Sequence, residues 1–209
     1  MKFWIYILLT TLLMTTQGCS VFGIRSGYEQ LDYTIEEQIG DVQIRTYPAR
    51  IAVQIKGAKD DSEAFFALFD YISGKNISST SISMTSPVEL DRTSSKIAMT
   101  SPVEKSKDDD TATSMRFFIP KEFSFDEVPK PTDSRLTLVQ LPSEKFAVLQ
   151  YSGSSSDEKF LHKSAELIQK LKTTKWKVID TPTFHGYDPP FTIPFLKRNE
   201  VVVKVIRQT

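Results

Sequence analysis

The sequence has few of the residues from which metal sites and covalent cross-links are built. Its 209 residues include one cysteine, Cys19, and two histidines, His162 and His185. A single cysteine cannot form an internal disulfide, and together with two scattered histidines it does not supply the ligands of a usual zinc site. A disulfide-stapled fold and a structural zinc domain are therefore excluded.

Catalytic motifs are missing as well. The chain has no nucleophile elbow, no phosphate-binding P-loop and no dinucleotide fingerprint. The carboxylate pairs Glu36-Glu37 and Asp60-Asp61 fit a solvated strand end and a helix cap better than acid–base work. His162 is expected on the polar side of a helix, and His185 is expected to bond a loop carbonyl rather than iron. The pattern favours a binding module over an enzyme.

Neither charge sign is in excess. The chain has 26 basic and 26 acidic residues, and loss of residues 1–18 removes one lysine and leaves a net charge of −1. A balanced surface argues against nucleic acid or an acidic membrane surface as the partner.

One apolar run, from Phe3 to Leu13, begins the chain. It falls short of the ~20 residues of a membrane-spanning helix. Preceded by Lys2 and followed by small residues, it predicts a secretory signal peptide over residues 1–18.

The position of Cys19 just after this segment resembles a bacterial lipobox, although Thr16 stands where leucine is usual. The resemblance implies a lipid on Cys19, a tether over residues 19–30 and a folded domain over 31–209. The domain would then lie on the periplasmic side of a bacterial membrane, and Ser20 implies the outer membrane in a Gram-negative host. The alternative is an uncleaved N-terminal anchor, which also leaves the domain outside the cytoplasm.

One eight-residue motif occurs twice in the chain, over residues 82–89 and 97–104, with seven of eight positions identical. The two copies together are called the doublet. The copies start 15 residues apart, which is too close for a solenoid repeat and fits two strands of one hairpin. Each strand is expected to end near its proline, Pro87 or Pro102, because proline donates no hydrogen bond to a sheet.

Within the doublet, Met84 and Met99 each follow an isoleucine by two residues and so share its strand face. A double wall of methionine and isoleucine suits an irregular apolar ligand. The alternative is that both methionines fill the core.

The rest of the chain consists of two similar halves, each with strands followed by one helix. Alternating apolar residues predict strands, and apolar residues at helical spacing predict a helix from the Asp60 region to Gly74 and another after Asp157. The strands are expected at 33–37, 42–47, 51–55, 115–119, 136–141, 146–151, 176–179 and 201–206. The pattern indicates an α+β fold, with a curved antiparallel sheet or distorted barrel carrying two helices.

Four motifs together resemble the SOUL haem-binding protein family. They are the Met-Thr-Ser-Pro-Val doublet and the segments 42–49, 69–76 and 187–201, which follow in the family's order and extend the resemblance from about Tyr28 to Ile206. The resemblance implies a distorted antiparallel β-barrel of two pseudo-symmetric halves, each with one α-helix on the sheet. It also implies non-covalent binding of haem or a related tetrapyrrole, without catalysis.

The resemblance places the ligand in a groove beside the first helix. The resemblance implies Phe65 and Phe69 for the apolar wall, to which the repeated motif adds Met84 and Met99, and Arg45, Lys197 and Arg198 for the ligand's carboxylates. Ser62 and Asp70 are also expected to face the groove, where neither can pair with a carboxylate.

Two functions therefore remain open. The first is a membrane-tethered, monomeric carrier or buffer of haem or another flat apolar molecule. The second is a structural or interaction lipoprotein whose groove binds a partner segment or is filled by Phe66, Phe191 and Phe195.

Overall fold

The computed structural model describes residues 29–78, 80–91, 113–189 and 191–208. The expected signal peptide, Cys19, most of the tether, Met99 and the second copy of the doublet lie outside these residues. Among the described residues, no helix is long and apolar enough to cross a membrane.

The structure has two main helices and twelve strands in the described segments. The helices are α2 (Asp61–Ile72) and α3 (Asp157–Leu171), and a short 3-10 helix, η1, spans Pro194–Leu196. The strands are β1 (Glu29–Gln30), β2 (Thr34–Ile39), β3 (Val42–Tyr47), β4 (Arg50–Ala58), β5 (Thr85–Ser86), β6 (Val88–Asp91), β7 (Thr113–Phe118), β8 (Leu136–Leu141), β9 (Glu144–Tyr151), β10 (Trp176–Val178), β11 (Thr183–Gly186) and β12 (Asn199–Arg207).

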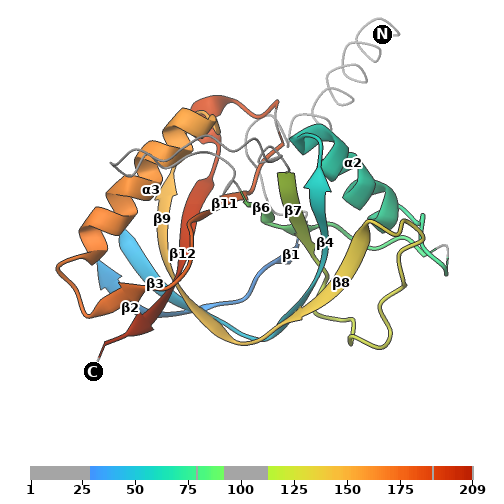
Figure 1. Ribbon diagram of the computed structural model, residues 1–209, viewed down its shortest axis with the longest axis horizontal. Coiled ribbons are helices and arrows are strands. Elements are labelled where there is room, and N and C mark those ends of the chain that lie inside the picture. Colours follow the sequence, from blue (N-terminus) through green and yellow to red (C-terminus); the bar gives the residue numbers. More distant parts are fainter. Residues whose placement is uncertain (1–28, 79, 92–112, 190, 209) are drawn as a thin grey trace, which may run out of the picture.

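Ten of these strands form one antiparallel sheet in the order β2-β3-β9-β12-β11-β6-β7-β4-β8, with β10 also paired to β12. The order shows that the two halves exchange strands. Strand β3 of the first half pairs with β9 of the second, and β8 of the second half pairs with β4 of the first. The sheet is strongly curved, and Figure 1 shows α2 and α3 on its outer side, one over each half. The predicted α+β fold with two sheet-packed helices is confirmed.

Two tight connections, from β3 to β4 and from β8 to β9, lie against each other. The Ser143 hydroxyl of the second connection donates to the Tyr47 carbonyl of the first at 3.1 Å. Arg50, at the start of β4, lies 3.8 Å from the carboxylate of Glu144, at the start of β9. The contact draws the two ends of the sheet together, although β2 and β8 do not pair with each other in the described segments.

Helix α2 begins where an N-cap side chain is available. The Asp60 carboxylate accepts the Glu63 backbone N–H at 2.8 Å, and the helix ends before Gly74, whose φ of 109° suits glycine. Its buried face consists of Ala64, Leu68, Tyr71 and Ile72. Phe66 and Phe69, which also belong to the helical pattern of apolar residues, are 63% and 43% exposed.

Helix α3 buries Phe160, Ser164, Leu167 and Leu171. Ala165, the residue next to Ser164, is exposed. Ser164 is tolerated on the buried face because its hydroxyl donates to the Phe160 carbonyl at 2.8 Å.

The described copy of the doublet differs from the predicted hairpin. Residues 82–84 form no strand, β5 pairs in parallel with β1, and β6 begins directly after Pro87. Strand β6 then pairs with β7 and β11. As expected, a strand, β5, ends directly before Pro87, but a second strand, β6, begins directly after it. Residues 183–186, expected as loop, form β11 in the middle of the sheet.

The helix–sheet packing predicts the effect of one core substitution. Leu68 lies on the inner face of α2 and is fully buried. Leu68→Ala should therefore lower the free energy of unfolding by about 2–5 kcal/mol, through lost burial and a residual cavity. Urea denaturation measures this change. The exposed Ile77→Ala is the control and should stay within about 0.5 kcal/mol of the unchanged protein. Equal effects of the two substitutions would contradict the packing described here.

Candidate functional site

The two central strands, β6 and β11, present opposite chemistries on their two faces. Val88 and Leu90 of β6 line a groove on the helix-bearing face, together with Phe184 of β11. Glu89 and His185 point to the concave face, because successive side chains of a strand alternate. Glu89 lines a separate cavity there.

The groove on the helix-bearing face has a volume of about 640 Å³. It lies between the first turns of α2, strands β6 and β11, and the segment 187–197. Its volume falls in the ~300–1,000 Å³ range of small-molecule sites. Most of its wall is apolar or aromatic: Phe65, Phe66, Met84, Val88, Leu90, Phe184, Tyr187 and Phe191.

The ring of Phe65, in this wall, is held in place by two neighbouring rings, Phe69 and Phe117. Its ring stacks on Phe69 with centroids 5.9 Å apart and an interplanar angle of 13°, and its edge meets Phe117 at 5.4 Å. Phe69 itself does not line the groove, so it backs Phe65 rather than contacting a ligand. Phe66 and Phe191 line the groove yet remain 63% and 64% exposed, so they flank the groove without filling it.

The other residues implied by the resemblance divide into two groups. Met84, Ser62 and Lys197 line the groove. Asp70 lies outside it and forms an ion pair with Lys75 at 2.8 Å. The acidic side chains that do line the groove are Asp61 and Asp188.

Arg45 and Arg198 do not line the groove but bind the fully buried carboxylate of Glu200. The Arg45 guanidinium donates to both Glu200 oxygens at 3.1 Å, and Arg198 donates to Oε1 at 2.7 Å. The Tyr187 hydroxyl donates to Oε2 at 2.8 Å. Because the Tyr187 side chain also belongs to the groove wall, this buried ion network positions part of the groove.

The two arginines decide the charge state of Glu200. Burial alone would raise the pKa of this carboxyl, but the positive charges of Arg45 and Arg198 outweigh burial and hold the pKa below its ordinary value. The opposite effect is seen at Tyr47, where burial raises the pKa of the phenol to about 12.

A row of polar residues crosses the concave face through consecutive strand pairs. The register places Glu200 beside His185, His185 beside Glu89, Glu89 beside Arg116, and Arg116 beside Gln54. Cross-strand neighbours of this kind interact directly. Arg116 forms a close ion pair with Glu89 and donates to Gln54 Oε1 at 2.9 Å.

His185 is part of this row and not of a loop. Its Nε2 lies 3.1 Å from Glu89 Oε2, and the side chain is buried. The expectation of a loop carbonyl as its partner is therefore wrong. Burial would raise the pKa of Glu89, but His185 and Arg116 together lower it below its ordinary value. His162 is exposed, as expected.

The described residues include no group of three or more histidine, cysteine or acidic side chains arranged to hold a metal ion. No histidine lines the groove in those segments, and Met84 and Met115 supply soft sulfur atoms there.

Sequence comparison decides the family. The family model described as "SOUL heme-binding protein" matches residues 28–204. The chain belongs to the SOUL family. That family is associated with haem and tetrapyrrole binding and is generally non-enzymatic. No curated protein matches the chain.

Solved structures support the fold. The chain resembles the C-terminal domain of EcmrR with a TM-score of 0.53 and 10% identity, over 84% of this chain and 98% of that one. It also resembles a hydrolase from Listeria innocua with a TM-score of 0.55 and 16% identity, over 79% of this chain and 92% of that one. At such identities the likeness concerns the fold alone.

Sequence reasoning missed Glu89 and Glu200 as buried charges and Arg116 as the half-buried partner of Glu89. Glu89 ends the repeated motif and Glu200 lies in the last family motif, yet neither position shows in sequence that it is buried. The one available signal is the strand alternation of 88–90, which separates Glu89 from its apolar neighbours.

The network around Glu200 predicts both a loss of stability and a change in its pH dependence. Glu200→Gln leaves Arg45 buried without its carboxylate, so unfolding at pH 7 should require about 3–5 kcal/mol less free energy. Because the folded-state pKa of Glu200 is lowered, its contribution is present above about pH 4.5 and is lost as the pH falls through the lower folded-state value. The variant should therefore lose less stability on acidification, by up to ~1.4 kcal/mol per pH unit within that window.

Urea denaturation between pH 7 and pH 3 tests this expectation. The exposed Glu122→Gln is the control and should leave the stability at pH 7 unchanged. An unchanged slope in Glu200→Gln would show that Glu200 does not titrate as described.

Proposed function

We propose that the groove between α2 and the segment 187–197 binds haem or a related flat, apolar tetrapyrrole without catalysing a reaction. Family membership supports the ligand class. The observation that carries the proposal is the groove itself, which is large, mostly apolar and open between its flanking aromatic side chains.

The residues present fit the macrocycle better than its carboxylates. A porphyrin face can stack on Phe65, whose ring is held by Phe69 and Phe117, and can contact the Met84 side chain. Affinity then comes mainly from apolar burial, at ~25 cal/mol per Å². Lys197 is the basic residue that the groove offers to a carboxylate, because Arg45 and Arg198 are committed to Glu200.

The cellular role that fits this site is a carrier or buffer held at a membrane. We propose that Cys19 is lipidated after export and tethers the domain to the periplasmic side of a bacterial membrane, in a Gram-negative host the outer membrane. We expect the protein to act as a monomer and to bind no nucleic acid.

A second candidate function, docking of an apolar partner segment, rests on a separate observation. Phe66, Phe191 and Phe195 are all exposed, and the first two border the groove. Exposed aromatic groups around a concave apolar site also suit recognition of an apolar peptide. In that case the protein would be an interaction lipoprotein, and the ligand titration below separates the two functions.

Haemin should bind saturably and with one-to-one stoichiometry, at micromolar concentration or tighter, as measured by the Soret band. Phe65→Asp places a carboxylate in the apolar wall and should weaken binding at least about tenfold, because an unpaired charge in an apolar site is costly. Phe195→Asp adds the same charge at an exposed phenylalanine outside the groove and should leave binding unchanged.

A parallel titration with metal-free protoporphyrin IX tests whether the iron contributes to binding. With no iron ligand from the protein, the two tetrapyrroles should bind with affinities within about threefold of each other, a difference of under 1 kcal/mol. Weak, unsaturable haemin binding that is indifferent to Phe65→Asp would rule out the carrier function and favour docking of a partner segment.

Lipidation gives an independent prediction. When the full chain is produced in a Gram-negative host with radiolabelled palmitate, the protein should carry the label and fractionate with membranes. Cys19→Ser should abolish the label, because the thiol is the site of acylation. A labelled Cys19→Ser protein, or an unlabelled unchanged protein, would refute the lipid anchor.

A further inference from the structure

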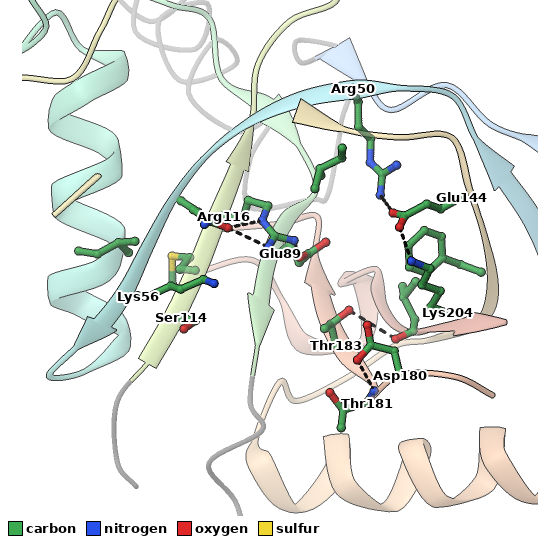
Figure 2. A pocket seen from close by; sticks show the side chains of 16 residues that line it. Arg50, Lys56, Glu89, Ser114, Arg116, Glu144, Asp180, Thr181, Thr183 and Lys204 are labelled. Atoms are coloured by element: carbon green, nitrogen blue, oxygen red, sulfur yellow. Dashed lines mark hydrogen bonds and ion pairs between the residues drawn. The ribbon is translucent and has the colours of Figure 1, made fainter. Parts of the chain in front are cut away.

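The concave face of the sheet holds a second cavity, of about 260 Å³, distinct from the groove. Figure 2 shows side chains from β4, β6, β7, β9, β11 and β12 converging on it. Met115 lines both cavities, and the other residues that line the concave cavity do not line the groove. Its walls are mostly polar and charged, unlike those of the groove.

Arg50 enters this cavity from the start of β4 (Figure 2). Its side chain is only 9% exposed. The guanidinium carbon lies 5.3 Å from the ring centroid of Tyr47, 5.6 Å from that of Phe118 and 5.5 Å from that of Phe146. These three rings hold the guanidinium in place and shield it from water.

The hydrogen bonds of this guanidinium are few and long. Nη1 donates to the carbonyls of Pro48 and Pro142 at 3.5 Å each, and Nη2 lies 3.8 Å from Glu144. Nε is buried and has no hydrogen-bond partner in the described structure. A buried guanidinium has five donors to satisfy, so Arg50 retains donors that nothing in the described protein accepts from at ordinary distance.

The carboxylates near Arg50 are held more tightly by other cations. Lys204 lies 2.5 Å from Glu144, and Arg116 forms a close ion pair with Glu89. The exposed Lys56 and Asp180 at the rim offset each other. Among the residues that the structure describes, the inner wall therefore carries three cations, Arg50, Arg116 and Lys204, against two carboxylates.

A buried cation without a full partner is costly, and the cost falls when an anion enters. The excess of one positive charge matches a monoanion. A planar guanidinium with unused donors binds a carboxylate through two parallel hydrogen bonds. The volume lies below the ~300 Å³ lower bound of drug-sized sites, so the occupant is a small molecule and not a macrocycle.

We propose that the concave cavity is a binding site for a small organic monocarboxylate, with Arg50 as its anchor. The carboxylate lies against the guanidinium, and the hydroxyl groups of Ser114 and Thr183 line the cavity for polar groups on the rest of the molecule. The site is independent of the tetrapyrrole groove, and it stands whether or not the groove takes haem.

Benzoate and pyruvate are suitable probes, with benzamide as the uncharged match of benzoate. They are titrated into the full chain to about 10 mM, which saturates a site of millimolar Kd, while the side-chain Nε–H resonance of Arg50 is followed by NMR. We expect a saturable shift of this resonance with at least one carboxylate and none with benzamide. This readout does not depend on the folding of any variant.

Arg50→Met should weaken carboxylate binding about tenfold or more, through loss of a charge-assisted hydrogen-bonded pair. It should leave the melting temperature unchanged or higher in the absence of ligand, because the variant removes an underpaired buried cation. Arg135→Met, an exposed arginine outside the cavity, is the matched control and should bind the carboxylate normally.

Three results would overturn the proposal. One is an Arg50 resonance that responds to no carboxylate or responds equally to benzamide. Another is undiminished binding in folded Arg50→Met. The last is saturable binding of inorganic phosphate at Arg50 without binding of either carboxylate, which would assign the site to a more highly charged anion.

Discussion

The alternation of side chains along β6 and β11 is the constraint on which both cavities depend. These strands lie in the middle of the sheet, with a helix over each half on one face and the concave surface on the other. Wherever one of these strands directs an apolar side chain toward the helices, the next side chain along the strand points to the concave face. Val88 and Leu90 enclose Glu89 in this way, and the result is an apolar groove behind a polar row. A shift of one residue in register would exchange the two surfaces.

The buried charges stabilise this arrangement because they satisfy one another across strands. Glu200 binds Arg45, Arg198 and Tyr187. Because Tyr187 also lines the groove, its hydrogen bond to Glu200 fixes the position of that part of the wall. The same commitment explains why the groove has so little positive charge. The family resemblance assigned Arg45 and Arg198 to the ligand's carboxylates, but both bind the carboxylate of Glu200 instead. An apolar ligand is therefore favoured over a highly charged one at this face. Arg50, in contrast, lies on the concave face with its donors largely unused.

Much of the fold could be read from the sequence, because its signals are local. The strands 42–47 and 136–141 have the bounds that were predicted, because strand-forming residues in both lie next to turn residues. The doublet was predicted in part: a strand does end before Pro87, but nothing in the sequence indicates that another strand begins directly after it. Strand β11 was missed because its four residues lie in an aromatic, proline-rich stretch. At the candidate site, Phe65, Met84 and Lys197 were found through resemblance. Arg45 and Arg198 were misplaced because their partner, Glu200, is distant from Arg45 in sequence and its burial leaves no local trace.

The central claim is that the two faces of one sheet present two sites of opposite chemistry, and that the tetrapyrrole belongs to the apolar one. A crystal structure of the protein with bound haemin tests it most directly. The account predicts the macrocycle against Phe65 and Met84, between α2 and the segment 187–197, with the concave cavity free of it. A macrocycle lodged on the concave face beside Arg50, or bound at the surface away from α2, would contradict the account.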